Sequence, residues 1–318
     1  MEYRKAGKWG VRLSRVGLGS FLTIGYKCDD RTSREMVALA YDRGVNFFDT
    51  ANIYNAGQAE IVLGRCLKDY PRSSLFVLSK VWGSMGAGPN DKGLSAKHIF
   101  EQCHASLERL GMDYLDLYMC HRPDPDTPVE ETIRAMEDLA RQGKILYWGV
   151  SEWSAGQIVE AQRVAKEIGA RSMILTQPRY NLLYRVPEKD LFPTTRTEGI
   201  GNVTYSPLAQ GMLTGKYALG KPALEGSRAA DPDQNAVIKK MYWKEEYQRK
   251  SHGLVEIANA IGVSAAQLAT AWCLGCPDVT SVILGARTVA QLKENLKAVD
   301  VKIPKDVSER MEELFPVN

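Results

Sequence analysis

Four polar residues near the ends of three successive apolar segments form a combination that could reduce a carbonyl group. Asp49, Lys80 and His121 each lie at or near the carboxyl end of such a segment, and Tyr54 follows shortly after Asp49. Reduction requires a hydride for the carbonyl carbon and a proton for its oxygen. A phenol can donate that proton, and a nearby ammonium group helps because it stabilises the phenolate left behind. The pattern therefore predicts Tyr54 as the proton donor if the fold brings these side chains together.

The other three side chains have complementary roles in this hypothesis. A buried Lys80 needs an anionic neighbour to remain charged, and Asp49 could supply it. A neutral imidazole at His121 could hydrogen-bond to the carbonyl oxygen and polarise it. The hydride must come from a bound cofactor. Each residue alone also has an ordinary structural interpretation, such as a loop-capping carboxylate or a surface lysine, and their shared position at segment ends favours catalysis.

Eight short apolar segments alternate with longer amphipathic ones along the chain. Most of the eight are apolar at nearly every position, which is typical of parallel strands covered on both faces. The segments are residues 15–19, 45–50, 74–81, 114–121, 145–151, 172–177, 202–207 and 280–286. Eight strand–helix units in a chain of 318 residues predict an α/β fold, a (β/α)8 TIM barrel. In such a barrel the catalytic groups project from the carboxyl ends of the strands.

Helix-start signals lie between the expected strands. Thr32, Ser154, Ser264 and Thr288 are each followed three positions later by Glu or Gln, which is the pattern of a capping box. Pro128 is expected at the first position of a further helix, where its missing N–H costs least. These signals predict where the helices of the barrel begin.

A doubly wound sheet is the alternative fold. Its dinucleotide-binding fingerprint has three glycines, whereas the first expected strand here ends in Gly17-Leu-Gly19 and lacks the third. Residues 1–318 are expected to form a single barrel domain, since no linker-like tract divides the chain. The first dozen residues are expected to form a β-hairpin that closes the barrel floor. Residues 208–250 are expected to be a long functional loop with helical pieces on the carboxyl face.

Composition argues against several other classes of protein. The chain is 44% apolar and 25% charged, with a net charge of +3 and no block of basic residues, so neither nucleic-acid binding nor membrane insertion is predicted. The start of the chain lacks the apolar core of a secretory signal, so a cytoplasmic location is expected. Cys273 and Cys276 form a C-x-x-C without a second ligand pair, and we interpret them as structural. No metal site is predicted, which disfavours a metal-dependent hydrolase.

Ordered motifs along the whole chain resemble those of the aldo-keto reductase family. FFDTANIYNAGQAEIVLG (47–64) resembles the family signature, and LSK (78–80) with YMCHRPD (118–124) completes its Asp/Tyr/Lys/His tetrad. The later motifs, in order, are GVSEW (149–153), TQPRYN (176–181), YSPLAQGMLTGKY (205–217) and VILGARTVAQLKEN (282–295). Within the family, the series SPLAQG, GKY, SRA and AWCL resembles the beta subunits of shaker-type potassium channels and their bacterial reductase relatives.

The resemblance implies NADPH-dependent reduction of aldehydes and ketones to alcohols, with Tyr54 as proton donor assisted by Lys80, Asp49 and His121. It also implies a set of residues that contact the NADP(H) cofactor. These are Ser20, Phe21, Asp49, Ser151, Glu152, Gln177, Tyr205, Ser206, Pro207, Leu208, Ala209, Gln210, Lys216, Arg228, Gly285, Arg287, Gln291, Glu294 and Asn295.

The implied cofactor contacts divide along the length of the nucleotide. Ser151 and Gln177 are implied to hold the nicotinamide carboxamide. Lys216 and Arg228 match a basic clamp on the pyrophosphate. Arg287 is suited to pair with the 2′-phosphate, a charge-assisted contact that favours NADPH over NADH.

Substrate contacts and departures from the family pattern concern a few positions. Phe21, Tyr54, Trp82 and His121 are predicted to contact the substrate, the three aromatic rings forming an apolar cup for an aldehyde side chain. Glu152 stands where the family usually has Asn, and a carboxylate cannot donate a hydrogen bond to the carboxamide. The channel subunits generally carry Asn where this chain has His121, which favours a working reductase.

The subgroup leaves a second function open. It implies a regulatory protein that binds NADPH, turns over slowly and docks onto a partner, and it implies a homo-oligomer, either a tetramer or an octamer. For the reductase, the expected partner is a small-molecule carbonyl compound. Arg122 could contact an anionic substrate, or it could form a salt bridge ahead of Pro123.

Overall fold

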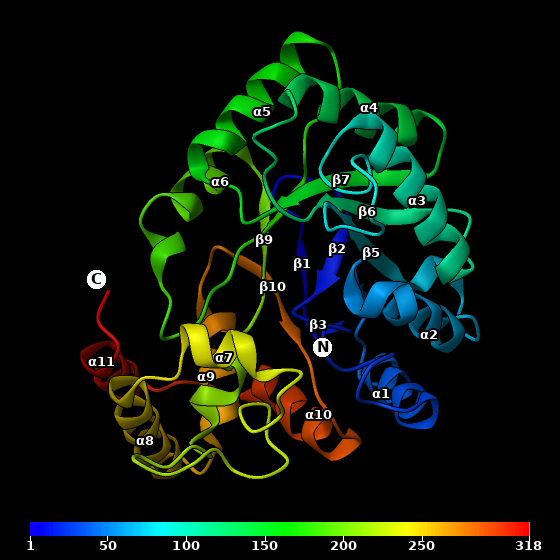
Figure 1. Cartoon of the computed structure of the whole chain (residues 1–318). Coiled ribbons are helices and arrows are strands. Elements are labelled where there is room, and N and C mark those ends of the chain that lie inside the picture. Colours follow the sequence, from blue (N-terminus) through cyan, green and yellow to red (C-terminus); the bar gives the residue numbers. More distant parts are fainter. Residues whose placement is uncertain (318) are drawn as a thin grey trace.

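The computed structural model describes residues 1–317 and has a closed barrel of eight parallel strands at its centre (Figure 1). The strands are β3 (Val16–Gly19), β4 (Phe47–Asp49), β5 (Phe76–Val81), β6 (Leu115–Cys120), β7 (Ile145–Ser151), β8 (Leu175–Gln177), β9 (Gly201–Thr204) and β10 (Val279–Leu284). They pair in chain order, and β10 closes the circle by pairing with β3. The predicted (β/α)8 barrel and its eight strand segments are confirmed. Every position of β5, β6 and β10 is buried, as expected of strands covered on both faces.

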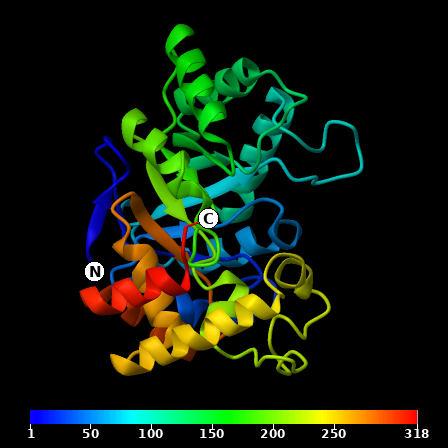
Figure 2. The same ribbon diagram turned by 90° about the vertical axis from the view of Figure 1, so that its left-hand side faces the viewer.

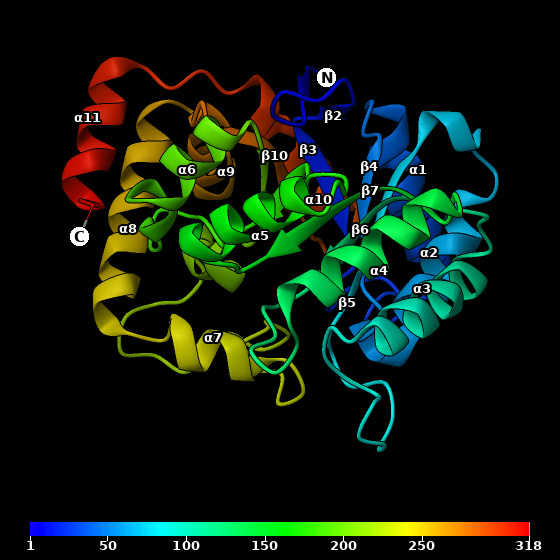
Figure 3. The same ribbon diagram turned by 90° about the horizontal axis from the view of Figure 1, so that it is seen from above.

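Helices surround the barrel on the outside, as the view from above shows (Figure 3). They are α1 (Asp30–Asp42), α2 (Gln58–Leu67), α3 (Ala96–Leu110), α4 (Val129–Arg141), α5 (Ala155–Glu167), α6 (Leu191–Glu198), α7 (Asn235–Met241), α8 (Glu245–Ala260), α9 (Ala265–Gly275), α10 (Val289–Leu296) and α11 (Lys305–Leu314). One core layer lies between strands and helices, and a second fills the barrel interior around Phe47 and Leu117. Within residues 1–317 no helix by itself combines the length and apolar composition needed to cross a bilayer; α8 and α9 meet these criteria only jointly, as a pair bent by 90°.

Helix starts agree with the predicted capping residues at three positions. Ser154 and Ser264 form reciprocal capping boxes at the starts of α5 and α9. Thr288 caps α10 by accepting from the backbone N–H of Gln291, whose own side chain accepts instead from the backbone N–H of Arg287 (3.0 Å). Each cap satisfies a backbone donor that has no partner inside the helix.

Two predicted helix starts are wrong. Thr32 is not a cap but lies in the first turn of α1, because Asp29 accepts the hydrogen bond from the Thr32 backbone N–H at 2.7 Å. Pro128 is not the first residue of α4 but its cap, and the helix begins at Val129. At α1 a second good capping residue, Asp29, stands nearby in the sequence, whereas at α4 the extended ψ of 133° places Pro128 just outside the helix.

The two ends of the barrel have different roles. The antiparallel hairpin of β1 (Tyr3–Lys5) and β2 (Arg12–Ser14) is confirmed, and it contributes Ala6 and Leu13 to the barrel interior. In Figure 2 this hairpin lies at the left, and the long loops that follow β5 and β9 lie at the right, at the opposite end of the barrel. Residues 208–250 contain the helical turn η4 (Ala209–Thr214), α7 and the start of α8, as expected. The loop-rich end is therefore the carboxyl face of the strands.

Candidate active site

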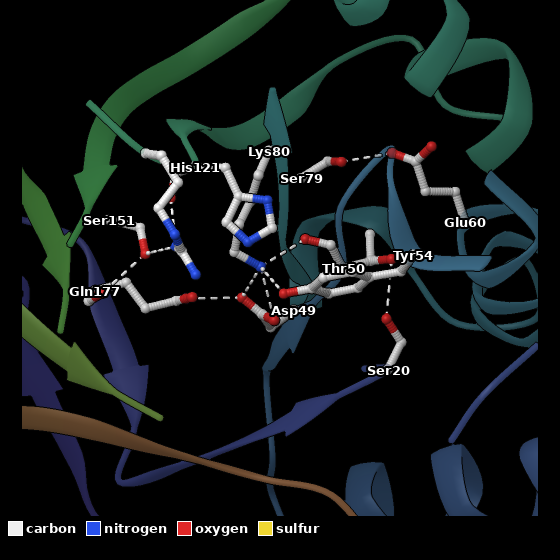
Figure 4. Close-up of polar contacts among 11 residues, drawn as sticks. Ser20, Asp49, Thr50, Tyr54, Glu60, Ser79, Lys80, His121, Ser151 and Gln177 are labelled. Atoms are coloured by element: carbon white, nitrogen blue, oxygen red, sulfur yellow. Dashed lines mark hydrogen bonds and ion pairs between the residues drawn. The ribbon is translucent and has the colours of Figure 1, made fainter. Parts of the chain in front are cut away.

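The four predicted catalytic side chains meet at the carboxyl ends of β4, β5 and β6 (Figure 4). Lys80 is completely buried, and its Nζ donates to Asp49 Oδ1 at 2.9 Å and to the Tyr54 Oη at 3.2 Å. A third bond joins Nζ to the backbone oxygen of Thr50 at 2.7 Å. The rings of Tyr54 and His121 meet edge to face with centroids 5.6 Å apart. The fold thus brings the phenol, ammonium, carboxylate and imidazole together.

Local backbone geometry positions these groups. The parallel pairing of β4 with β5 sets Asp49 beside Leu78, so the carboxylate and the ammonium two residues further along β5 reach the same end. Tyr54 begins a short 3-10 turn in which Asn55 and Ala56 have left-handed φ angles of 48° and 49°. Such a turn is costly for residues other than glycine, and it is held because the Asn55 amide donates to the Gly25 carbonyl at 2.6 Å. The turn keeps Tyr54 beside the strand ends.

Asp49 also connects Lys80 to the residues expected to bind nicotinamide. Gln177 donates through Nε2 to Asp49 Oδ2 at 2.8 Å, and Ser151 Oγ donates to the Gln177 backbone oxygen at 2.9 Å. Across the barrel mouth, Ser20 donates to the hydroxyl of Thr50 at 2.9 Å. The carboxylate therefore accepts from an ammonium and an amide at once, which fixes the orientation of all three groups.

Burial and neighbouring charges set the protonation of the site. Burial raises the pKa of the Tyr54 phenol well above its usual value of 10.0, and the charge of Asp49 adds to this shift. Burial lowers the pKa of the Lys80 amine, while the Asp49 carboxylate opposes that shift. Burial, and then the charges of Lys80 and Arg122, lower the pKa of His121 well below 6.5. At neutral pH Tyr54 is consequently a protonated donor and His121 a neutral imidazole.

A cleft of about 930 Å³ extends from these side chains to the start of α10. Most residues that the family resemblance assigns to the cofactor line it. They are Ser20, Phe21, Asp49, Ser151, Gln177, Tyr205, Ser206, Pro207, Leu208, Gln210, Lys216, Arg228, Gly285, Arg287, Gln291, Glu294 and Asn295. A cleft of this size is large enough for a dinucleotide.

Two cations in the cleft, Lys216 and Arg228, lack anionic partners among residues 1–317. Both Lys216 and Arg228 line the cleft, where Arg228 is half-buried and Lys216 is exposed, and within residues 1–317 neither forms an ion pair. Burial, and then the charge of Arg287, lower the pKa of Arg228 to about 10. Burial and the same two arginines lower the pKa of Lys216. Cations crowded together in this way are stabilised by an anion, so this part of the cleft fits a phosphate-bearing ligand.

Three residues expected to contact cofactor or substrate do not line the cleft. The Glu152 carboxylate accepts from the backbone N–H of Arg179 at 2.7 Å, on the neighbouring strand end. Ala209 is completely buried. Trp82 is 39% exposed but lies outside the cleft, whereas Phe21 lines it with its ring centroid 5.0 Å from that of Tyr54. Only Phe21 and Tyr54 of the predicted aromatic cup are therefore brought together.

A strap formed by residues 226–234 was not predicted in detail. It crosses the cleft near Arg287, whose Nη1 donates to the Gly226 carbonyl at 2.9 Å and whose Nη2 lies 3.6 Å from Asp231. Lys27, on the opposite rim, reaches Asp231 at 3.2 Å and Asp233 at 3.3 Å. The charged composition of the strap was visible in the sequence, but its partners Lys27 and Arg287 lie far from it in the chain, on opposite sides.

Among residues 1–317 no set of three or more His, Cys, Asp or Glu side chains is arranged to hold an ion. The C-x-x-C cysteines are both free thiols, and Cys273 is buried with its Sγ 3.8 Å from the Tyr180 carbonyl.

The fold and site geometry described above define a reductase-type barrel, and sequence comparison agrees. The profile of the aldo/keto reductase family matches residues 15–315, so the chain belongs to this family, which indicates an oxidoreductase. A relative from Oryza sativa subsp. japonica, named as a probable voltage-gated potassium channel subunit beta, is 45% identical over 305 residues, or 95% of this chain and 92% of the relative. A protein of the same name from Arabidopsis thaliana is 43% identical with the same coverage. The resemblance to the channel-subunit subgroup is thereby confirmed.

Proposed function

We propose that the protein reduces aldehydes and ketones to alcohols with NADPH, with Tyr54 as the proton donor. The observation that carries this proposal is the position of Lys80 Nζ, 3.2 Å from the Tyr54 hydroxyl and paired with Asp49 in a fully buried setting. A carbonyl compound that entered the cleft beside Tyr54 would meet the proton donor at this point.

The chain's own residues perform the proton half of the reaction. NADPH, when bound, supplies the hydride that the carbonyl carbon receives. Tyr54 gives the proton of its Oη to the carbonyl oxygen, and the Lys80 ammonium stabilises the phenolate that remains. Asp49 keeps Lys80 charged, which its burial would otherwise oppose. The neutral imidazole of His121 hydrogen-bonds to the carbonyl oxygen and polarises it.

Cofactor binding belongs to the same proposal. Ser151 and Gln177 hold the carboxamide, Lys216 and Arg228 bind the pyrophosphate, and Arg287 pairs with the 2′-phosphate. This assignment is supported by the positions of Lys216 and Arg228, which line the cleft without an anionic partner among residues 1–317. Glu152, whose carboxylate accepts from a backbone N–H, contributes nothing through its side chain here.

The proposal includes two properties of the whole molecule. We place the reductase in the cytoplasm, in keeping with six free cysteines, which are typical of reducing compartments. We also propose a homo-oligomer, a tetramer or an octamer, as the resemblance to the channel-subunit subgroup implies. Light scattering on the purified chain distinguishes these states from a monomer.

A panel of small aldehydes and ketones, assayed with NADPH and NADH in parallel, tests the activity. The expected result is alcohol formation with NADPH at a higher kcat/KM than with NADH. The loss of that preference on Arg287→Gln would support the 2′-phosphate contact. Failure to form alcohol from any compound of the panel, with NADPH bound, would reject the reductase.

A regulatory subunit is the second candidate, and the names of the two relatives favour it. Such a protein would bind NADPH tightly and release the oxidised cofactor much more slowly than a working enzyme turns over. The rate of cofactor release, measured by fluorescence beside the steady-state rate, decides between the two functions. Brisk multiple turnover, with release of the oxidised cofactor at least as fast as the steady-state rate, would exclude a purely regulatory role.

A further inference from the structure

Arg122 is a cation at the carbonyl end of the cleft that the proposed mechanism does not use. It follows His121 directly after β6, lines the cleft and is half-buried. Its Nη1 donates to the His121 backbone oxygen at 2.6 Å and lies 3.5 Å from Ser151 Oγ. These contacts hold one edge of the guanidinium group against the strand ends.

The other edge of Arg122 has no partner. Neither its Nε nor its Nη2 makes a hydrogen bond to residues 1–317, and no carboxylate of these residues forms an ion pair with it. The nearby cation Lys80 is already neutralised by Asp49. The salt bridge that was one interpretation of Arg122 is therefore not formed within this part of the chain.

The position of Arg122 separates it from the phosphate-binding cations. Besides burial, the charges of Arg228 and Arg287 lower the pKa of Lys216, and these three side chains line the same part of the cleft. The charge of Arg122 instead opposes the burial-driven rise in the pKa of Tyr54 and adds to the burial-driven fall in the pKa of His121. The cofactor phosphates proposed for the first group do not account for Arg122.

We propose that Arg122 binds a carboxylate on the substrate, so that the enzyme prefers aldehydes that carry a carboxylate group over neutral aldehydes of the same size. The inference rests on the proposed reductase function and names the substrate class of that site. A guanidinium group presents two parallel N–H donors, which match the two oxygens of a carboxylate. The free Nε–Nη2 edge is the pair that remains available for this contact.

The rest of the pocket agrees with a substrate of mixed character. Phe21, which is 40% exposed, and Tyr54 provide an apolar wall for the carbon skeleton. In the proposed mechanism the carbonyl oxygen of the substrate is bound between Tyr54 and His121. His121 is the residue before Arg122, so the guanidinium group lies close to that position. An aldehyde with a carboxylate at one end would thus meet complementary chemistry along its length.

Matched substrates test this specificity. The kcat/KM of the protein is measured with 4-formylbenzoate and with its neutral methyl ester, in the wild type and in Arg122→Met. We expect the wild type to favour the carboxylate and the variant to lose about 10- to 100-fold of that ratio, the usual strength of a charge-assisted hydrogen bond. Arg179→Met is the matched control, because Arg179 lies beside the barrel mouth over the ring of Tyr184, outside the cleft lining. It should change the ratio by less than about threefold.

A binding measurement keeps the inference separate from the reductase proposal. Calorimetry with benzoate and benzamide on the NADPH-loaded protein needs no turnover, and benzoate should bind more tightly to the wild type but not to Arg122→Met. If no aldehyde is reduced while benzoate still depends on Arg122, only the reductase proposal fails. An unchanged carboxylate-to-ester ratio, or equal affinity for benzoate and benzamide in the wild type, overturns the role of Arg122.

Discussion

Lys80 is a completely buried cation whose charge is balanced by one carboxylate, and this pairing governs the candidate site. Its Nζ lies 2.8 Å from the nearer Asp49 oxygen, and burial lowers the pKa of the amine. Breaking such a pair leaves an uncompensated buried charge, which costs about 3–5 kcal/mol. The same geometry that prepares Tyr54 for proton transfer is therefore also a determinant of stability.

Asp49→Asn is expected to lower the free energy of unfolding by about 3 kcal/mol, because it strands the Lys80 ammonium. The double variant with Lys80→Met should recover part of this loss, since no buried charge remains. Urea denaturation of the two single variants and the double variant measures the coupling. Losses that simply add would show that the two side chains are not energetically paired.

His121 gives the site a pH-dependent stability. Burial lowers its pKa well below 6.5, so the folded state binds its proton less readily than the unfolded state does. The stability from a neutral His121 is present above about pH 6.5 and is lost as the pH falls toward its folded-state pKa. When the pH is lowered from about 7.5 to about 5, the free energy of unfolding should therefore fall less in His121→Asn than in the wild type. The difference between the two proteins should be at most about 1.4 kcal/mol for each pH unit. Parallel melting curves over this range make the comparison, and identical acid sensitivity in both proteins would contradict it.

At the residue scale, the sequence identified the groups at strand ends but not their partners. Asp49, Lys80 and His121 could be recognised because a polar residue that ends an apolar segment must project from the barrel rim. Glu152 could not be placed, since its carboxylate is bound by the backbone of Arg179 on the next strand. The environment of Arg122 was equally hidden, because it depends on which carboxylates the fold leaves out of reach.

At the scale of elements, strands were easier to predict than helix starts. A strand buried on both faces must be apolar along its length, as β5 and β6 are, so composition alone marks it. A helix start depends on one hydrogen bond, and several residues compete to make it. At α1 the cap is Asp29 and not Thr32. The Asp29 carboxylate accepts from the backbone N–H of Thr32, so the helix starts before Thr32 and encloses it in its first turn.

The strap over the cleft is expected to control cofactor release. Lys27 joins the rim of the cleft to Asp231 and Asp233 on the strap, and Asp231 also lies 3.6 Å from Arg287. Lys27→Ala should speed NADPH dissociation by about two- to tenfold, an effect that high salt should reproduce in the wild type. Stopped-flow fluorescence measures the rate. Arg134→Ala, which removes an exposed pair within α4, serves as the control and should leave the rate unaltered.

At the scale of the whole molecule, the two ends of the chain are joined through the barrel. β10 pairs with β3, and the backbone N–H of Val282 donates to the Arg15 carbonyl at 2.9 Å. Arg15 in turn donates from its backbone N–H to the carbonyl of Glu2, the residue before β1 of the hairpin. Closure of this kind makes the first and last strands depend on each other.

We therefore expect residues 1–318 to unfold as one cooperative unit. Circular dichroism and tryptophan fluorescence should report the same denaturation midpoint, and saturating NADPH should raise it. Two separate transitions would instead show that part of the chain folds independently. That outcome would contradict a single domain without affecting the geometry of the cleft.

The most direct measurement for the whole account is single-turnover reduction of an aldehyde by Tyr54→Phe pre-loaded with NADPH. The account predicts a rate at least about 100-fold below that of the wild type, together with an unchanged dissociation constant for NADPH. A rate near that of the wild type would show that another group delivers the proton, and the assignment of Tyr54 beside Lys80 would be wrong.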